Sequence, residues 1–187
     1  MSEPVRRPLV PLLAALAVLL VVAAVVVGVV LGRGDDEPAV ASGTSASAPA
    51  DVLTPTGYDA LLDAVRGEQD GTEAFALLVR ADEAFVDLPR DATSQRSATW
   101  RWDGELTPDS EGSTGAARFD LADLDVAVLR SLVDRAEAEV EEPTGWTVDV
   151  SGPRDPGGDA IRVSVLNAQG DSAVVVAALD GTVRAGG

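Results

Sequence analysis

The sequence contains no cysteine, no histidine and no lysine, and these absences exclude several classes of active site. Without Cys and His there can be no Ser-His-Asp triad, no Cys-His pair and no thiolate or imidazole ligand for zinc. Without Lys there can be no Ser-Lys dyad and no Schiff-base lysine. No disulfide can form either, so any folded domain must be held by its hydrophobic core.

Two further motif classes are missing. Neither glycine-rich phosphate loop, GxGxxG or GxxxxGK[ST], is present. Asp120, Asp123 and Asp125 cluster before an apolar helical stripe, but they do not form a calcium-binding DxDxDG loop, so we interpret them as helix caps. Paired carboxylates could still hydrolyse glycosides, yet no acidic pair stands out. We therefore predict that the protein is not an enzyme and has no cofactor and no metal site.

Aromatic residues are scarce, at 4% of the chain, and two of them lie two positions apart. Trp100 and Trp102 would share one face of a strand. Such a pair can form a ligand or partner face, because Trp anchors interfaces and stacks on sugars. The other interpretation, which we favour, places both indoles in the core beneath a helix.

Basic charge is also scarce. The formal net charge is −17, and the first 32 residues contribute Arg6, Arg7 and Glu3, a net +1, so the remainder carries −18. This charge repels nucleic acid and anionic lipid headgroups, and we expect no nucleic-acid partner. We interpret it as a solvated acidic surface, with a docking face for a basic partner as the alternative.

The chain does contain one long apolar run, over residues 9–32, without a charged residue. A helix of that length spans roughly 36 Å, enough to cross a hydrocarbon core of about 30 Å. Arg6 and Arg7 precede the run, whereas Arg33 is followed at once by acidic residues. The arginine excess predicts a cytoplasmic N-terminus and an extracytoplasmic C-terminal part. A cleaved signal peptide is the alternative, but its apolar region is usually about 7–15 residues long.

These features predict four segments: a short cytoplasmic tail over 1–8, a transmembrane helix over 9–32 that contacts the lipid bilayer, a disordered linker over 33–55, and an extracytoplasmic α+β domain over 56–187. The linker is rich in Ala, Ser, Gly and Pro and has no apolar periodicity.

The domain pattern starts with a helix and three strands. Apolar residues from Tyr58 to Val65 recur at helical spacing, with Thr56 as the expected N-cap and Gly67 as the expected end. We expect strands over 75–79, 84–88 and 97–102, a turn at Asp103-Gly104, and a polar loop over 107–115.

The same order then recurs. An apolar stripe from Leu129 to Val140 predicts a second helix, which Asp123 or Asp125 can cap. Strands are expected over 146–150, 161–166 and 173–179, followed by a turn at Asp180-Gly181. The fold class is therefore α+β, with two tandem α-β-β-β units over 56–106 and 119–185, each with an antiparallel sheet.

This helix–strand order and its glycine-containing turn resemble the PepSY-like units of bacterial envelope proteins. The all-Arg basic composition with abundant Ala, Val and Gly is similar to that of uncharacterised actinobacterial membrane-anchored proteins. The resemblance implies a plasma-membrane protein with a non-catalytic binding domain in the cell envelope, whose partner is an envelope protein or a glycan. The alternative is a structural spacer or assembly factor that acts through its transmembrane helix.

Overall fold

The computed structural model describes residues 51–155 and 157–184. The predicted tail over 1–8, the transmembrane helix over 9–32 and most of the linker over 33–55 lie outside these residues. Within the described ranges, no helix combines the length and the hydropathy that crossing a membrane requires.

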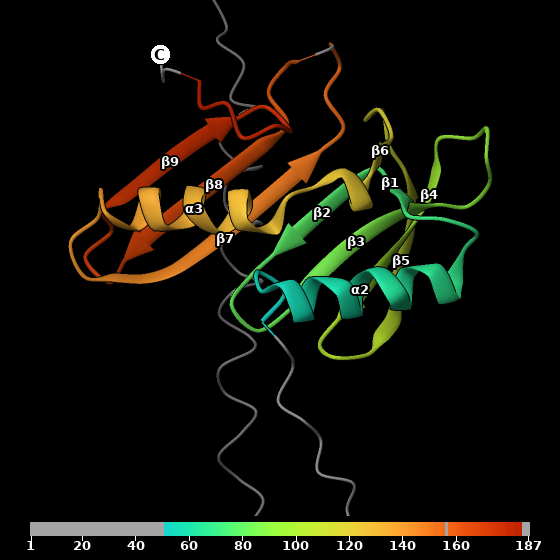
Figure 1. Ribbon diagram of the computed structural model, residues 1–187, viewed down its shortest axis with the longest axis horizontal. Helices are drawn as coiled ribbons and strands as arrows, with labels where there is room; N and C mark the ends of the chain where they lie inside the picture. Colours follow the sequence, from blue (N-terminus) through green and yellow to red (C-terminus); the bar gives the residue numbers. More distant parts are fainter. Residues whose placement is uncertain (1–50, 156, 185–187) are drawn as a thin grey trace, which may run out of the picture. The chain divides into compact units, whose positions relative to one another are not determined.

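The described residues form an α+β domain with two α-helices and a seven-stranded antiparallel sheet (Figure 1). The helices are α2 (Pro55–Glu68) and α3 (Val126–Glu137), and a short 3₁₀ helix, η1 (Leu121–Asp123), precedes α3. The strands of the large sheet are β2 (Ala76–Val79), β3 (Ala84–Pro89), β4 (Arg96–Trp102), β5 (Leu106–Ser113), β7 (Pro143–Ser151), β8 (Ile161–Asn167) and β9 (Ser172–Ala177). A separate two-stranded sheet pairs β1 (Glu73–Ala74) with β6 (Phe119–Asp120).

The order of strands in the large sheet is β5-β4-β3-β2-β7-β8-β9. Strands β2 to β5 form one meander and β7 to β9 form another, and each meander follows a helix. The two are joined by the central β2–β7 pair, in which Leu77 lies opposite Val150 and Val79 opposite Val148. One sheet therefore runs through both halves of the domain, and the prediction of a separate antiparallel sheet in each unit is wrong because β2 and β7 pair with each other.

The first helix is confirmed, but its predicted boundaries are wrong. Thr54, not Thr56, is the N-cap of α2, and its hydroxyl accepts a hydrogen bond from the Gly57 amide at 3.1 Å. Pro55 then occupies the first helical position, where its missing N–H costs nothing. Gly67 lies inside the helix, which ends at Glu68.

The second helix is capped by Asp125, whose carboxylate accepts a hydrogen bond from the Ala127 amide at 2.9 Å. Leu129, Leu132 and Val133 are buried along its inner face, as the apolar stripe predicts. The helix ends at Glu137, so Val140 is buried in the connection that follows it and not in the helix itself.

All six predicted strands are present, with boundaries shifted by a few residues. The polar loop predicted over 107–115 is wrong, because residues 106–113 form β5. This strand pairs with β4 at the edge of the sheet, and seven of its eight residues are exposed. It has no apolar alternation because neither of its faces is buried.

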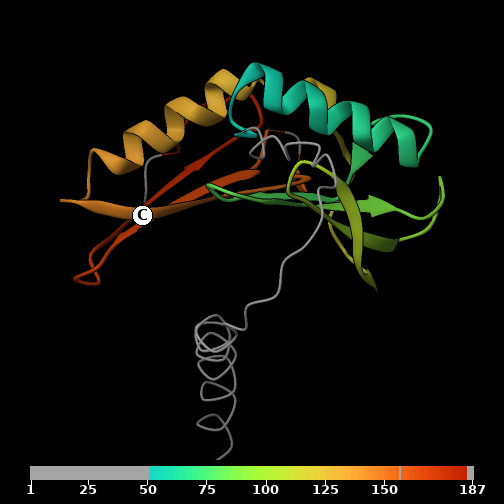
Figure 2. The same ribbon diagram turned by 90° about the horizontal axis from the view of Figure 1, so that it is seen from below.

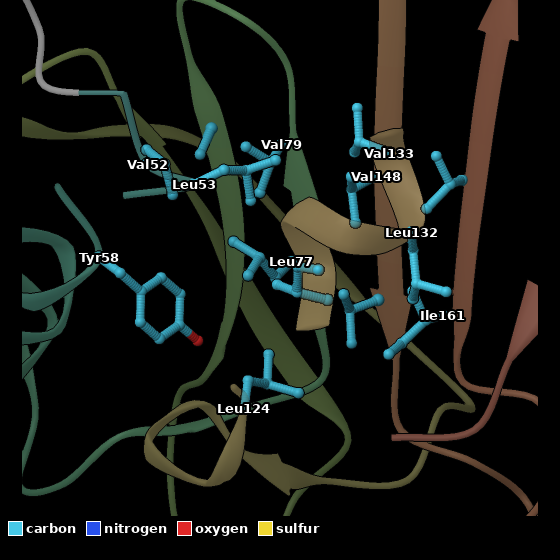
Figure 3. Close-up of a cluster of buried hydrophobic side chains, with 14 of the residues drawn as sticks. Val52, Leu53, Tyr58, Leu77, Val79, Leu124, Leu132, Val133, Val148 and Ile161 are labelled. Atoms are coloured by element: carbon cyan, nitrogen blue, oxygen red, sulfur yellow. The ribbon is translucent and has the colours of Figure 1, made fainter. Parts of the chain in front are cut away.

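Both helices lie on the same side of the sheet (Figure 2). The hydrophobic core lies between the two helices and the sheet. Figure 3 shows Leu77, Val148 and Ile161 from the sheet, with Tyr58 and Leu132 from the helices. The Tyr58 hydroxyl donates a hydrogen bond to the Leu121 carbonyl at 2.8 Å, which ties α2 to the segment before α3.

The ordered domain begins earlier than the sequence predicts. Val52 and Leu53 fall within the linker predicted over 33–55, yet each is 4% exposed and belongs to the core. Asp51 holds this entry segment, since its carboxylate accepts a hydrogen bond from the Leu53 amide at 2.9 Å.

Candidate functional site: the uncovered face of the sheet

The two faces of the sheet differ in their covering. Leu77, Val79 and Val86 point toward the helices and are fully buried. Their neighbours Leu78 and Phe85 point to the opposite side and are half-buried. No helix of the described chain covers that side (Figure 2). We call it the open face.

A single row of side chains crosses the open face from β4 to β9. The strand registers place Arg101 beside Phe85, Phe85 beside Leu78, and Leu78 beside Asp149. Asp149 in turn lies beside Arg162, and Arg162 beside Val176. We call these six residues the cross-strand row. Its apolar and charged groups occur in pairs, Phe85 with Leu78 and Asp149 with Arg162, and it carries one arginine on each half of the sheet.

The most exposed large hydrophobic side chains of the described residues also lie on the open face. Leu166 on β8 is 54% exposed and Val174 on β9 is 45% exposed. Since Leu166 pairs with Ser172 and Ser164 with Val174, the two apolar side chains are diagonal neighbours on the same face. Together they extend the apolar part of the open face toward the edge of the sheet.

The arginines on the β4 half of the open face are paired with carboxylates. Glu83 accepts hydrogen bonds from Arg80 and Arg101, both at 2.9 Å. Burial tends to raise the pKa of Glu83, but the hydrogen bonds and charges of the two arginines outweigh it, and the pKa lies below its usual value. The Arg80 guanidinium also lies 5.8 Å from the centre of the Phe85 ring. Arg101 also pairs with Asp103 at 3.2 Å, so both arginines on this half are already held by carboxylates of the same domain.

Charged groups on the β7–β9 half are not paired. Asp149 and Arg162 are neighbours across the β7–β8 ladder, yet within the described residues neither belongs to an ion pair. Both side chains are exposed. They line a shallow groove of about 340 Å³ together with Ser151, Asp159 and Val176. Both charges remain available to a binding partner.

The tryptophans occupy the other face. Trp102 is 5% exposed and belongs to the core, while Trp100 is half-buried and packs against it. The registers place Trp100 opposite Val86 and Trp102 opposite Ala84, both of which point toward the helices. The Trp102 Nε1 has no hydrogen-bond partner in the described chain. Neither indole reaches the open face, so Trp102 in particular offers little surface to a ligand.

The residues that make up the open face were not identified from the sequence as a site. Leu166 and Val174 occur within apolar runs that predict strands. Because the same runs also contain core residues, the sequence does not separate the exposed residues from the buried ones. Only the alternation within β8 marks Leu166 as out of phase with Ile161, Val163 and Val165. Comparison with known protein families, curated proteins and solved structures finds no match to this chain.

Proposed function

We propose that this chain is a single-pass membrane protein whose extracytoplasmic domain is a non-catalytic binding domain in the cell envelope, with the open face as its binding surface. The observation that carries the proposal is the exposure of Leu166 and Val174 on a sheet face that no described helix covers. Contiguous exposed apolar surface of this kind is typical of interaction sites. The absence of His, Cys and Lys removes the residues on which many catalytic sites depend, and this absence supports a binding role over a catalytic one.

Membrane anchoring rests on the uncharged run over 9–32, and its orientation on Arg6 and Arg7. The domain would then face outward in the plasma membrane. A chain of 18 residues, from 33 to 50, separates the apolar run from the first described residue. These residues would then connect the membrane anchor to the domain.

The architecture supports the proposal of two tandem α-β-β-β units. In each half a helix precedes an antiparallel meander, of four strands in the first half and three in the second, and the leading strands, β2 and β7, pair with each other at the centre. After each third strand the chain turns back: Leu106 pairs with Trp102, and Val183 pairs with Ala177. A return along the third strand therefore occurs in both halves, as the strand β5 in the first and as a single bridge in the second.

A protein partner fits the open face better than a glycan does. Sugar-binding sites commonly stack an exposed aromatic ring on the sugar, because the apolar faces of both rings then lose water. All seven aromatic side chains lie in the described residues, and none is exposed: Tyr58, Phe75, Trp102 and Phe119 are buried, and Phe85, Trp100 and Trp146 are half-buried. The exposed groups are aliphatic, which suits a protein surface.

The alternative is a spacer or assembly factor that acts through the transmembrane helix. Gly28 and Gly32 favour it, because small residues four apart allow two membrane helices to approach closely. A photoreactive residue at Val174 in the native membrane would distinguish the two functions. The binding domain predicts crosslinked adducts from Val174 and none from the same residue at Ala138, which lies at the end of α3. A spacer predicts no adduct from either site.

The orientation has its own test. Protease added to intact cells that express the chain should remove the C-terminal domain and leave the Met1 end protected. This expectation follows from the two arginines before the apolar run. A domain that becomes accessible only after lysis would contradict the orientation but not the binding role.

A further inference from the structure

Acidic charge is distributed unevenly over the domain. The helical layer and its connections, residues 55–72 and 121–142, contain eleven Asp or Glu and three Arg, a balance of −8. In the six strands other than the edge strand β5, the positions that face the open side contain Asp87, Asp149, Arg101 and Arg162, a net charge of zero. Two copies of this acidic domain therefore repel each other least when their open faces meet.

We propose that the open face binds the open face of a second copy of this chain, so that the Asp149 carboxylate of each copy meets the Arg162 guanidinium of the other. A two-fold interface is self-complementary: when one residue contacts a second, the second also contacts the first. Asp149 and Arg162 meet this requirement, since they have opposite charge, are exposed neighbours, and form no ion pair within the described residues. The proposal rests on the open face being the binding surface.

The size and composition of the open face suit such a contact. Seven strands about 4.8 Å apart and about 20 Å long present roughly 700 Å². A stable interface buries about 800 Å² on each partner. Packing of the two sheets would also cover Leu166, Val174 and Val176, which are exposed or half-buried in the single copy.

The arrangement also separates the two acidic layers. In a face-to-face pair the helices lie on the outer sides, with both sheets between them, so that their charges are far apart and screened by salt. Two copies anchored in the same membrane would in addition have a high effective concentration, which favours a contact that is weak in dilute solution.

The absence of cysteine makes the test direct. Ser164 is half-buried on the open face between Arg162 and Leu166, and Ser131 is exposed on α3. In the full chain in native membranes, Ser164→Cys should give a thiol-crosslinked species of twice the chain mass. The matched variant Ser131→Cys should not. Failure of Ser164→Cys to crosslink would overturn the proposal, while adducts from photoreactive Val174 to other proteins would leave the binding role intact.

Charge reversal tests the specific pairing. In the Ser164→Cys background, Arg162→Asp and Asp149→Arg should each reduce crosslinking at least tenfold, because like charges then meet. Mixing these two variants should restore it, since each now supplies the charge that the other lacks. Arg135→Asp on α3 makes the same charge change on the opposite face and should have no effect. Unchanged crosslinking in either single variant, or no recovery on mixing, would contradict the Asp149–Arg162 contact.

Discussion

At the scale of single residues, the domain buries a few polar groups whose environment is unusual. The Tyr58 phenol is in the core, where burial, with a smaller contribution from the Asp120 carboxylate, raises its pKa well above the ordinary value of about 10. The Asp120 carboxylate accepts hydrogen bonds from the Thr72 hydroxyl and the Ala122 amide, and both lower its pKa. Each of these groups links the region around η1 to the rest of the fold.

Tyr58 is the single tyrosine, so its ionisation can be followed by phenolate absorbance. Its raised pKa stabilises the fold fully below about pH 10, and this contribution is lost as the pH rises toward the folded-state value. We expect no phenolate signal near pH 10 while the domain remains folded, and a rise only with alkaline unfolding. A normal titration near pH 10 with unchanged circular dichroism would show that Tyr58 is not buried.

The two neighbouring tryptophans should differ in their effect on stability. Trp102→Ala removes a core side chain and should cost about 3–5 kcal/mol of unfolding free energy, whereas Trp100→Ala should cost less because Trp100 is half-buried. Trp102→Phe should cost less than Trp102→Ala, since it keeps a ring and removes the unpartnered Nε1 donor. Urea unfolding measures all three. Equal costs for the two alanine variants would contradict the placement of the strand.

At the scale of elements, α3 covers the second half of the sheet and contacts β7, β8 and β9. Its position is fixed by the apolar side chains Leu129, Leu132 and Val133, and by a close approach at its start. A Cβ added to Gly181 would lie 2.3 Å from a Val128 methyl, so the turn after β9 fits against α3 only with glycine there.

Leu132→Asp tests this packing. It places a charge without a partner at a position that is 3% exposed, and we expect the loss of more than about 4 kcal/mol and of a cooperative transition. Ser131→Asp, one residue earlier and exposed, is the matched control and should change stability by less than about 0.5 kcal/mol. If both variants melted alike, α3 would not face the core.

The sequence predicted the longer elements that have one buried face. It missed β5, which has no buried face, and the two-residue strands β1 and β6, which are too short to show a period. The stripes of α2 and α3 and the apolar strands were visible because burial imposes a period on them. Strand β5 has no such period, and its Pro108 suits an edge strand, so its sequence reads as a loop. The open face was also hidden, because it exists only once β2 and β7 pair, and strand order leaves no local signal.

At the scale of the whole molecule, the seven-stranded sheet makes the two halves of the domain interdependent. The helix and strands before residue 116 share one core with those after it, and the β2–β7 ladder crosses between them. The halves have similar architectures. If either half folded alone, however, the strand that it contributes to the central pair, β2 or β7, would have one edge without a hydrogen-bonding partner.

We therefore expect the described domain to unfold in a single transition. Trp100 and Trp102 lie in the first half and Trp146 in the second, so fluorescence of the Trp146→Phe variant reports on the first half. Fluorescence of the Trp100→Phe/Trp102→Phe variant reports on the second. The two urea midpoints, each compared with circular dichroism of the same variant, should coincide. A difference between fluorescence and circular dichroism within either variant would show that the halves unfold separately.

The β2–β7 ladder also fixes the order in which the chain can fold as it is synthesised. Val79 pairs with Val148, so the centre of the sheet must wait for sixty-nine further residues to leave the ribosome. The first meander can form before then, but one edge of β2 stays unpaired throughout. Nascent chains that stop between β5 and β7 would carry this open edge, and they are the species on which we expect chaperones or misassembly to act.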